Sequence, residues 1–309
     1  MSSDRAALHI GTRGSLLALD QTRRVAALMT QVDASLTIET TVVHTSGDHD
    51  KHTPLAILGG QGIFARELQA ALHSGAIDLA VHSAKDLPSE QAPGLIIAAF
   101  LDREDPRDVL VSRDGSGLAE LPEGARVGTS SRRRLTALRG LRPDVDAVEL
   151  RGNLDTRLGK VAAGEVDAAI LAAAGMLRMG WGDRISQYLS LDDFVPAPGQ
   201  GALAVECRAD DTALRDLLER LADPAVALAV GTERAFLAGV GGGCRSPLGA
   251  HALVEGGTVT LRAMLADEDL RYLLRETRSV PVDGAAALAW ALAREMREAL
   301  GQLTVEAER

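Results

Sequence analysis

Residues 8–15, with the sequence LHIGTRGS, have the pattern of a short strand that ends in Gly11-Thr12 and leads into a helix. Ser15 favours the N-cap of a helix, because its side-chain oxygen can accept a hydrogen bond from the first turn. Apolar residues at helical spacing then continue to about Met29. The same pattern returns at residues 127–131 (VGTSS). The repeat predicts two α/β domains built on one plan.

A second repeat supports this plan. Residues 75–81 (GAIDLAV) are matched by residues 164–170 (GEVDAAI). Strands that alternate with helices favour mainly parallel sheets, whose ligand sites lie at the carboxyl ends of the strands. In the first copy the strand leads to Lys85-Asp86, and the second copy has Ala174-Gly175 there. We therefore expect the chemistry in the first domain and ligand binding in the second.

The rest of the chain predicts a hinge and a third domain. Residues 196–201 (PAPGQG) resemble a hinge, and residues 202–207 form a predicted strand that returns to the first sheet. Further on, Glu255-Gly256-Gly257 marks a hairpin, residues 271–280 form a third strand, and Asp283 caps a helix to about Leu300. The predicted domains are 1–101 plus 202–220, 106–195, and 224–309, the last a small α+β domain with a three-stranded antiparallel sheet.

Composition restricts the class of protein. The chain has 309 residues, of which 46% are hydrophobic and 3% aromatic, so Leu, Val, Ile and Ala must fill the cores. Two cysteines cannot make a disulfide framework, and they suit a reducing compartment. The N-terminus lacks an apolar signal region, and no apolar run is long enough to cross a bilayer. We expect a soluble cytoplasmic protein with no membrane partner.

The charge is unevenly distributed. The net charge of −10 argues against nucleic acid as a partner. Residues 126–160 nevertheless hold nine basic and four acidic residues. A solvated helix face would explain scattered arginines, but clustered ones favour a small polyanionic ligand, because the guanidinium fork binds carboxylates bidentately. The arginines near predicted strand–helix junctions are Arg13, Arg133, Arg134, Arg151, Arg157 and Arg178.

Two further features could carry chemistry, and no metal site is predicted. Asp86 follows an apolar strand beside a lysine, so it is a candidate general acid/base or partner of a developing cation, although a surface turn would look similar. Residues 239–247 (GVGGGCRSP) place Cys244 in a glycine loop beside Arg245, which favours the thiolate. The alternative is a connector with an inert cysteine. Cys207 is predicted to be structural.

From near Leu8 to at least Pro247 the chain resembles the porphobilinogen deaminase (hydroxymethylbilane synthase) family. Six motifs in the same order carry the resemblance, and the last leads to Gly243-Cys244. They are residues 11–15 (GTRGS), 80–88 (AVHSAKDLP), 128–134 (GTSSRRR), 151–157 (RGNLDTR), 198–202 (PGQGA) and 233–237 (ERAFL).

The resemblance implies a monomeric, three-domain transferase whose first two domains resemble periplasmic binding proteins. It also implies a dipyrromethane cofactor joined by a thioether to Cys244. Four porphobilinogen molecules would condense head to tail on this primer with loss of ammonia. Hydrolysis would then release hydroxymethylbilane for tetrapyrrole biosynthesis. Each pyrrole carries acetate and propionate, so the growing chain is a polyanion that needs arginines, and Asp86 suits the cationic azafulvene left when ammonia departs.

The resemblance assigns roles to residues of this sequence. The catalytic residues are Asp86, Lys85 and Arg13. The cofactor-binding residues are Cys244, Lys85, Asp86, Ser131, Arg133 and Arg134. The substrate-binding residues are Arg13, Ser15, Phe64, Arg151, Arg157 and Arg178.

The sequence departs from the family pattern in two places. Ile57 and Gln61 stand where the family often has lysines in the loop before Phe64, and Arg132 stands where leucine is common. Which two of the three consecutive arginines face the ligand is therefore open, and we predict Arg133 and Arg134. Two alternatives are a non-catalytic binding protein for a small dicarboxylate, which would need no cysteine, and a thiolate-dependent hydrolase.

Overall fold

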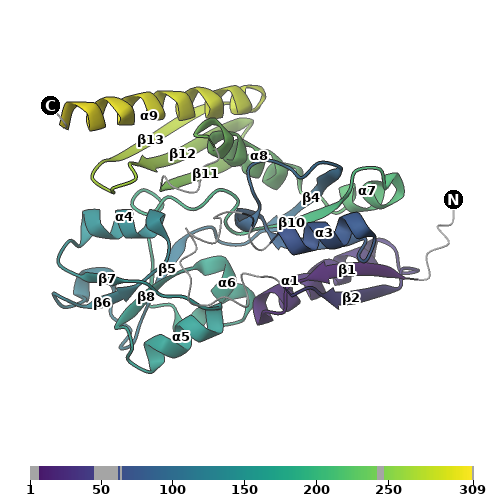
Figure 1. The fold of residues 1–309 in the computed structure, drawn as a ribbon, viewed down its shortest axis with the longest axis horizontal. Coiled ribbons are helices and arrows are strands. Elements are labelled where there is room, and N and C mark those ends of the chain that lie inside the picture. Colours follow the sequence, from purple (N-terminus) through teal and green to yellow (C-terminus); the bar gives the residue numbers. More distant parts are fainter. Residues whose placement is uncertain (1–6, 45–61, 63–64, 242–246, 308–309) are drawn as a thin grey trace. The chain divides into compact units, whose positions relative to one another are not determined.

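The computed structural model describes residues 7–44, 62, 65–241 and 247–307 (Figure 1). The described chain divides into two compact units. Unit 1 comprises Met1–Arg103 and Ala202–Ala227, and unit 2 comprises Glu104–Gly201 and Leu228–Arg309. The chain thus passes between the units after Arg103, after Gly201 and within one helix.

Unit 1 contains a five-stranded sheet with the order β2-β1-β3-β10-β4. The strand β1 is parallel to β2 and β3, whereas β10 is antiparallel to β3 and β4. The elements of this unit are β1 (Leu8–Thr12), α1 (Leu16–Val32), β2 (Ile38–Val42), α3 (Arg66–Ser74), β3 (Leu79–Ser83), the 3₁₀ turn η1 (Ala84–Asp86), β4 (Leu95–Arg103), β10 (Ala202–Arg208) and α7 (Thr212–Glu219).

Unit 2 contains a second five-stranded sheet with the order β7-β6-β8-β5-β9. Here β6 is parallel to β7 and β8, and β5 is antiparallel to β8 and β9. Its elements are β5 (Asp108–Ser112), β6 (Arg126–Gly128), α4 (Arg132–Leu141), β7 (Asp146–Val148), α5 (Leu154–Ala162), β8 (Ala168–Ala172), α6 (Ala173–Arg178), β9 (Gln187–Tyr188) and two 3₁₀ turns, η2 (Leu118–Glu120) and η3 (Gly182–Arg184).

The two sheets confirm the predicted repeat but not the predicted strand direction. In each sheet the three strands at one side are parallel, as the α/β pattern predicts, and the remaining pairings are antiparallel. The prediction of mainly parallel sheets was therefore wrong for half of the pairings. The prediction that residues 202–207 return to the first sheet is confirmed, since Val205 pairs with Val81. That returning strand is the source of the antiparallel pairings in unit 1.

Packing explains why a glycine ends the first strand of each repeat. A Cβ atom on Gly11 would lie 2.2 Å from Cδ1 of Ile77, and one on Gly128 would lie 2.7 Å from Cδ2 of Leu150. Both neighbouring side chains are buried. The serine caps are also confirmed, because Ser15 accepts a hydrogen bond from the amide of Ala18 at 3.3 Å. Gly75 ends α3 in the left-handed conformation, with φ of 74°.

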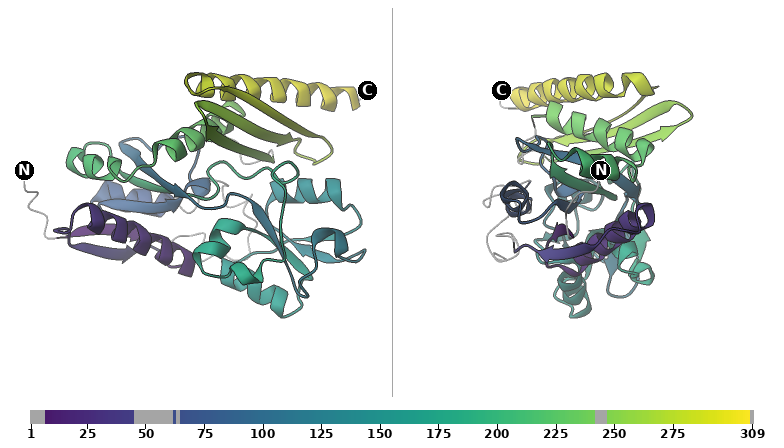
Figure 2. Two further views of the ribbon diagram at one scale, coloured as in Figure 1. Left: turned by 180° about the vertical axis from the view of Figure 1, so that it is seen from behind. Right: turned by 90° about the vertical axis from the view of Figure 1, so that its right-hand side faces the viewer.

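Unit 2 also contains a three-stranded antiparallel sheet with the order β11-β12-β13. Buried residues of two helices pack against it, and Figure 2 shows α9 running along its face. The hairpin is confirmed, since Gly256 and Gly257 have φ of 55° and 78°, as a tight two-residue turn requires. The elements are α8 (Pro224–Gly239), β11 (Leu248–Glu255), β12 (Thr258–Ala266), β13 (Leu273–Pro281), the 3₁₀ turn η4 (Val282–Gly284) and α9 (Ala285–Ala307).

The predicted start of the last helix was wrong. Asp283 lies inside the turn η4, and α9 begins at Ala285 and continues past Leu300 to Ala307. Among the residues that the structure describes, no helix is both long enough and apolar enough to cross a membrane. The described part also contains no group of three His, Cys, Asp or Glu side chains that could hold a metal ion.

Substitution of Gly249 by alanine is expected to destabilise unit 2. A Cβ atom there would lie 2.5 Å from the carbonyl oxygen of Val195 and 3.0 Å from that of Pro196. These are backbone atoms, and the Pro196 carbonyl already accepts a hydrogen bond from Ala250 at 2.9 Å. We expect a loss of about 2–3 kcal/mol, in the range of overpacked cores, measured as a lower urea midpoint.

Gly231→Ala is the matched control for this prediction. Gly231 lies inside α8, and a Cβ atom there would meet no atom within 4 Å. Alanine is favoured over glycine in helix interiors by about 0.5–1 kcal/mol, so this variant should be equally or more stable. A Gly249→Ala protein that unfolds at the wild-type urea concentration would show that residues 195–196 do not lie against β11.

Candidate active site

In unit 1 the predicted catalytic residues lie at the carboxyl ends of two neighbouring parallel strands. Arg13 follows β1, and the turn η1 at the end of β3 carries Lys85 and Asp86, both half-buried. Arg13 and Asp86 line one cavity of about 20 Å³. The other residues around this cavity are Ala18, Gln21, Ala65, Val81, His82 and Ser83. The structure therefore brings Arg13 and Asp86 together, where ligand sites of α/β sheets are found.

The helix α1 begins beside this cavity. Ser15 uses its hydroxyl oxygen to cap the helix, and the positive end of the helix dipole favours anions there. Gln21, one turn further along, donates a hydrogen bond from Nε2 to the hydroxyl of Ser83 at 3.1 Å. Sequence reasoning did not select Gln21 or His82, although His82 lies within a motif of the family resemblance. Their partners are remote in sequence, so no local pattern marks them.

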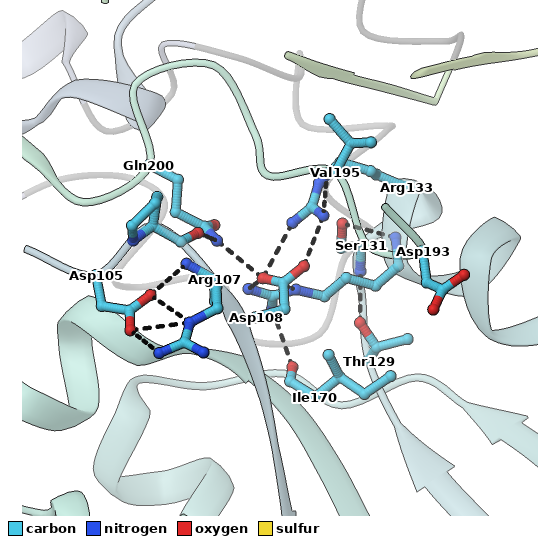
Figure 3. Close-up of polar contacts among 12 residues, drawn as sticks. Asp105, Arg107, Asp108, Thr129, Ser131, Arg133, Ile170, Asp193, Val195 and Gln200 are labelled. Atoms are coloured by element: carbon cyan, nitrogen blue, oxygen red, sulfur yellow. Dashed lines mark hydrogen bonds and ion pairs between the residues drawn. The ribbon is translucent and has the colours of Figure 1, made fainter. Parts of the chain in front are cut away.

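In unit 2 the consecutive residues Arg133 and Arg134 surround one buried carboxylate. Arg133 Nη1 lies 2.6 Å from Asp108 Oδ2, and Arg134 Nη2 lies 2.7 Å from Asp108 Oδ1. Gln200 donates from Nε2 to the same Oδ1 at 2.9 Å. Figure 3 shows Asp108 between Arg133 and Gln200, with Arg133 also reaching the carbonyl of Val195. We refer to Asp108, Arg133, Arg134 and Gln200 as the Asp108 cluster.

The Asp108 cluster is buried from solvent and carries more positive than negative charge. Asp108 is fully buried, and Arg133 and Arg134 are 5% and 6% exposed. Burial alone would raise the pKa of the Asp108 carboxyl, but the charges and hydrogen bonds of the two guanidinium groups hold it well below its usual range. Burial lowers the pKa of Arg134, while Asp108 opposes that shift. Two cations facing one anion leave an excess positive charge, which suits a further carboxylate.

The remaining predicted residues of unit 2 lie at helix ends. Ser131 caps α4 by accepting a hydrogen bond from the amide of Arg134 at 3.5 Å. Arg157 donates from Nε to the carbonyl of Gly152 at 2.8 Å, and the carbonyl of Arg151 accepts from Lys160 at 3.5 Å. Arg178 is 6% exposed and donates to the carbonyl of Gly201 at 2.6 Å.

The three consecutive arginines have different surroundings. Arg132 is exposed and donates a hydrogen bond to the carbonyl of Glu268, whereas Arg133 and Arg134 point into the Asp108 cluster. Sequence analysis did not find Asp108, which lies 25 residues before Arg133. Asp108 is the first residue of β5, and the rest of that strand is mostly apolar. An acidic residue at the start of an apolar strand was therefore the signal in the sequence that could have identified it.

Two predicted residues, Cys244 and Phe64, lie outside the described residues, as do Ile57 and Gln61. The described elements that flank Cys244 are α8, which ends at Gly239, and β11, which begins at Leu248. Cys207 lies in the core of unit 1, where burial and then the charge of Asp211 raise the pKa of its thiol to about 11. This thiol is therefore protonated at neutral pH, in agreement with the predicted structural role.

The sequence matches two family models that together cover most of the chain. "Porphobilinogen deaminase, dipyromethane cofactor binding domain" matches residues 8–216, and "Porphobilinogen deaminase, C-terminal domain" matches residues 227–298. Relatives named porphobilinogen deaminase include that of Syntrophobacter fumaroxidans, 48% identical over 94% of this chain and 92% of its own. Another, from Roseiflexus castenholzii, is 47% identical over 96% of this chain and 98% of its own.

Solved structures give weaker similarities. The VFT2 domain of Bordetella pertussis BvgS has a TM-score of 0.42 and 18% identity, over 71% of this chain and 87% of its own. An arginine-specific periplasmic binding protein from Salmonella typhimurium has a TM-score of 0.40 and 15% identity, over 72% of this chain and 94% of its own. The family matches carry the conclusion. The chain belongs to the porphobilinogen deaminase family, has its dipyrromethane cofactor-binding domain, and has porphobilinogen deaminase (hydroxymethylbilane synthase) activity in tetrapyrrole biosynthesis.

Proposed function

We propose that Asp86 is the main catalytic residue of this deaminase and that Lys85 and Arg13 assist it. The observation that supports this role is the position of Asp86 beside Arg13 in a cavity at the carboxyl edge of β1 and β3. Loss of ammonia from porphobilinogen breaks a C–N bond and leaves a cation on the substrate. A carboxylate in a confined site stabilises such a cation more strongly than water does. The Asp86 carboxylate can also accept the proton that the attacked ring carbon loses.

The arginines are proposed to hold the acetate and propionate groups of the pyrroles. The excess positive charge of the Asp108 cluster fits this task, as do the half-buried Arg151 and Arg157. Each bidentate arginine–carboxylate pair fixes orientation as well as charge. The proposed substrate-binding residues are Arg13, Ser15, Phe64, Arg151, Arg157 and Arg178.

The dipyrromethane is proposed to be joined to Cys244 by a thioether and to be held by Lys85, Asp86, Ser131, Arg133 and Arg134. When bound, it supplies the pyrrole carbon to which the first substrate molecule is joined. Four porphobilinogen molecules are proposed to add head to tail before hydrolysis. A monomeric, cytoplasmic enzyme is also proposed, and the two cysteines of the chain suit a reducing compartment.

The intact mass of the purified protein tests the covalent primer. We expect an excess over the chain mass equal to two porphobilinogen units less two ammonia molecules. The Cys244→Ala variant should have the mass of the bare chain, because no thioether can form. The Cys207→Ala variant is the control and should keep the excess, since Cys207 is buried in the core of unit 1.

Incubation with porphobilinogen distinguishes an unprimed preparation from a wrong assignment. A bare wild-type chain that gains the adduct on incubation supports the proposal. A wild-type chain that gains none, or a Cys244→Ala chain that carries the adduct, would refute the role of Cys244.

A further inference from the structure

A buried histidine–glutamate pair lies behind the Asp86 cavity. His82 on β3 and Glu206 on β10 are 6% and 2% exposed, and His82 Nε2 lies 3.1 Å from Glu206 Oε2. The second carboxylate oxygen, Oε1, accepts a hydrogen bond from Nε2 of Gln69 on α3 at 2.9 Å. The site described above uses neither His82 nor Glu206.

The sheet register explains how the pair reaches the cavity. His82 is opposite Ala204 and Glu206 is opposite Ala80, so both side chains lie on one face of the sheet. Gln69 shows that this face is the one covered by α3. Since His82 also lines the cavity that contains Asp86, the pair connects the core of unit 1 with that cavity.

The pair occupies two buried positions of the sheet. Burial of an imidazole and a carboxylate is costly, and apolar residues of similar size are often equally stabilising at such positions. An ionised carboxylate can only accept hydrogen bonds, so the contact with Glu206 favours the tautomer in which Nε2 donates and Nδ1 is the acceptor nitrogen. A carboxylate that orients an imidazole in this way is a recurrent arrangement for holding a proton.

We propose that His82, oriented by Glu206, is a positioning residue that takes from Asp86 the proton lost at each condensation. The inference rests on the proposed role of Asp86. In this step the new C–C bond forms after ammonia has left, and the C–H electrons of the attacked pyrrole carbon return to the ring. The proton passes to Asp86, then to His82, and finally to solvent or to the ammonia already released. Asp86 and His82 both line the cavity of about 20 Å³, which has room for about one water.

The charge state of His82 depends on the groups around it. Glu206 contacts it from β10, and Arg13 and Asp86 share its cavity. Lys85 belongs to the same turn as Asp86. The helix α3 contributes the neutral amide of Gln69, and its charged or titratable residues are Arg66, Glu67 and His73.

Two conservative variants test the proposal through the pH dependence of kcat. His82→Gln keeps a donor toward Glu206 but cannot take up a proton, so kcat should fall by about 10- to 100-fold. The pH profile of kcat should also change on its acidic side, with KM unchanged. Glu206→Gln keeps the size of the side chain and one acceptor oxygen but removes the carboxylate charge beside His82. kcat should then also fall and its pH profile should change, because the imidazole is no longer oriented by a carboxylate.

Two further measurements separate this role from a structural one. Histidine-selective NMR should show a changed His82 imidazole resonance in Glu206→Gln, with the resonance assigned by its absence in His82→Gln. Asp78→Asn is the matched control, because Asp78 is a buried carboxylate at the other end of β3 that accepts from the amide of His9 and from Arg208. It should lower stability and leave the pH profile unchanged.

The proposal would be overturned if His82→Gln retained wild-type kcat and an unchanged pH profile. It would also be overturned if Asp78→Asn changed the pH profile in the way expected for His82→Gln. Either result leaves the proposed function intact if Asp86→Asn is inactive. An active Asp86→Asn enzyme would instead overturn the proposed role of Asp86.

Discussion

The Asp86→Asn variant is expected to lose about a thousandfold or more in kcat and to remain folded. Asparagine has nearly the same shape as aspartate, but it carries no charge and cannot accept the ring proton. In other enzymes with confined active sites, removing either the charge or the proton acceptor lowers kcat by about a hundredfold or more. The measurement is the rate of ammonia release from porphobilinogen, with the intact mass recorded so that a missing primer is not mistaken for a lost chemical step.

Asp216→Asn is the control for this prediction. Asp216 is an exposed residue of α7 in the same unit, and its neutralisation changes the charge of the protein by the same amount. We expect wild-type kcat and an unchanged unfolding midpoint. An Asp86→Asn enzyme that carries the primer and retains more than a tenth of wild-type kcat would contradict the proposed role of Asp86 as the main catalytic residue.

The Asp108→Asn variant is expected to lose about 3–5 kcal/mol of stability in unit 2, because it leaves two buried guanidinium groups without their counter-charge. Asp108 is fully buried and accepts hydrogen bonds from Arg133, Arg134 and Gln200. Urea unfolding followed by circular dichroism measures the loss. The surface pair of Arg142 and Asp144 provides the control, and Asp144→Asn should cost less than about 1 kcal/mol.

The effect of Asp108 should depend on pH in a defined direction. The pKa of its carboxyl is lowered in the folded protein, and an unfolded aspartate titrates near pH ~3.9. The stabilisation is therefore fully present above about pH 5 and is lost as the pH falls below about 4 toward the folded pKa. The stability difference between wild type and Asp108→Asn should be constant at neutral pH and shrink in acid. A difference that grows in acid would contradict the assignment of the shift to Asp108.

The sequence by itself determined the local structure and the repeated plan. Ser15 and Ser131 start helices where predicted, because caps depend on hydrogen bonds between residues a few positions apart. The hairpin at residues 255–257 follows for the same reason. The motifs at residues 11–15 and 80–88 also placed Arg13 and Asp86 at strand ends, since each includes the end of a strand and the turn after it.

The tertiary structure alone decided which remote residues meet. It placed β10 antiparallel to β3, paired His82 with Glu206 across 124 residues, and enclosed Asp108 between two arginines 25 and 26 residues away. Such contacts depend on how the strands are ordered in the sheet and on which side chains are removed from water. The spacing of residues in one sequence shows neither. A local pattern indicates on which face of a strand or helix a residue lies, but it does not indicate which remote residue that side chain contacts.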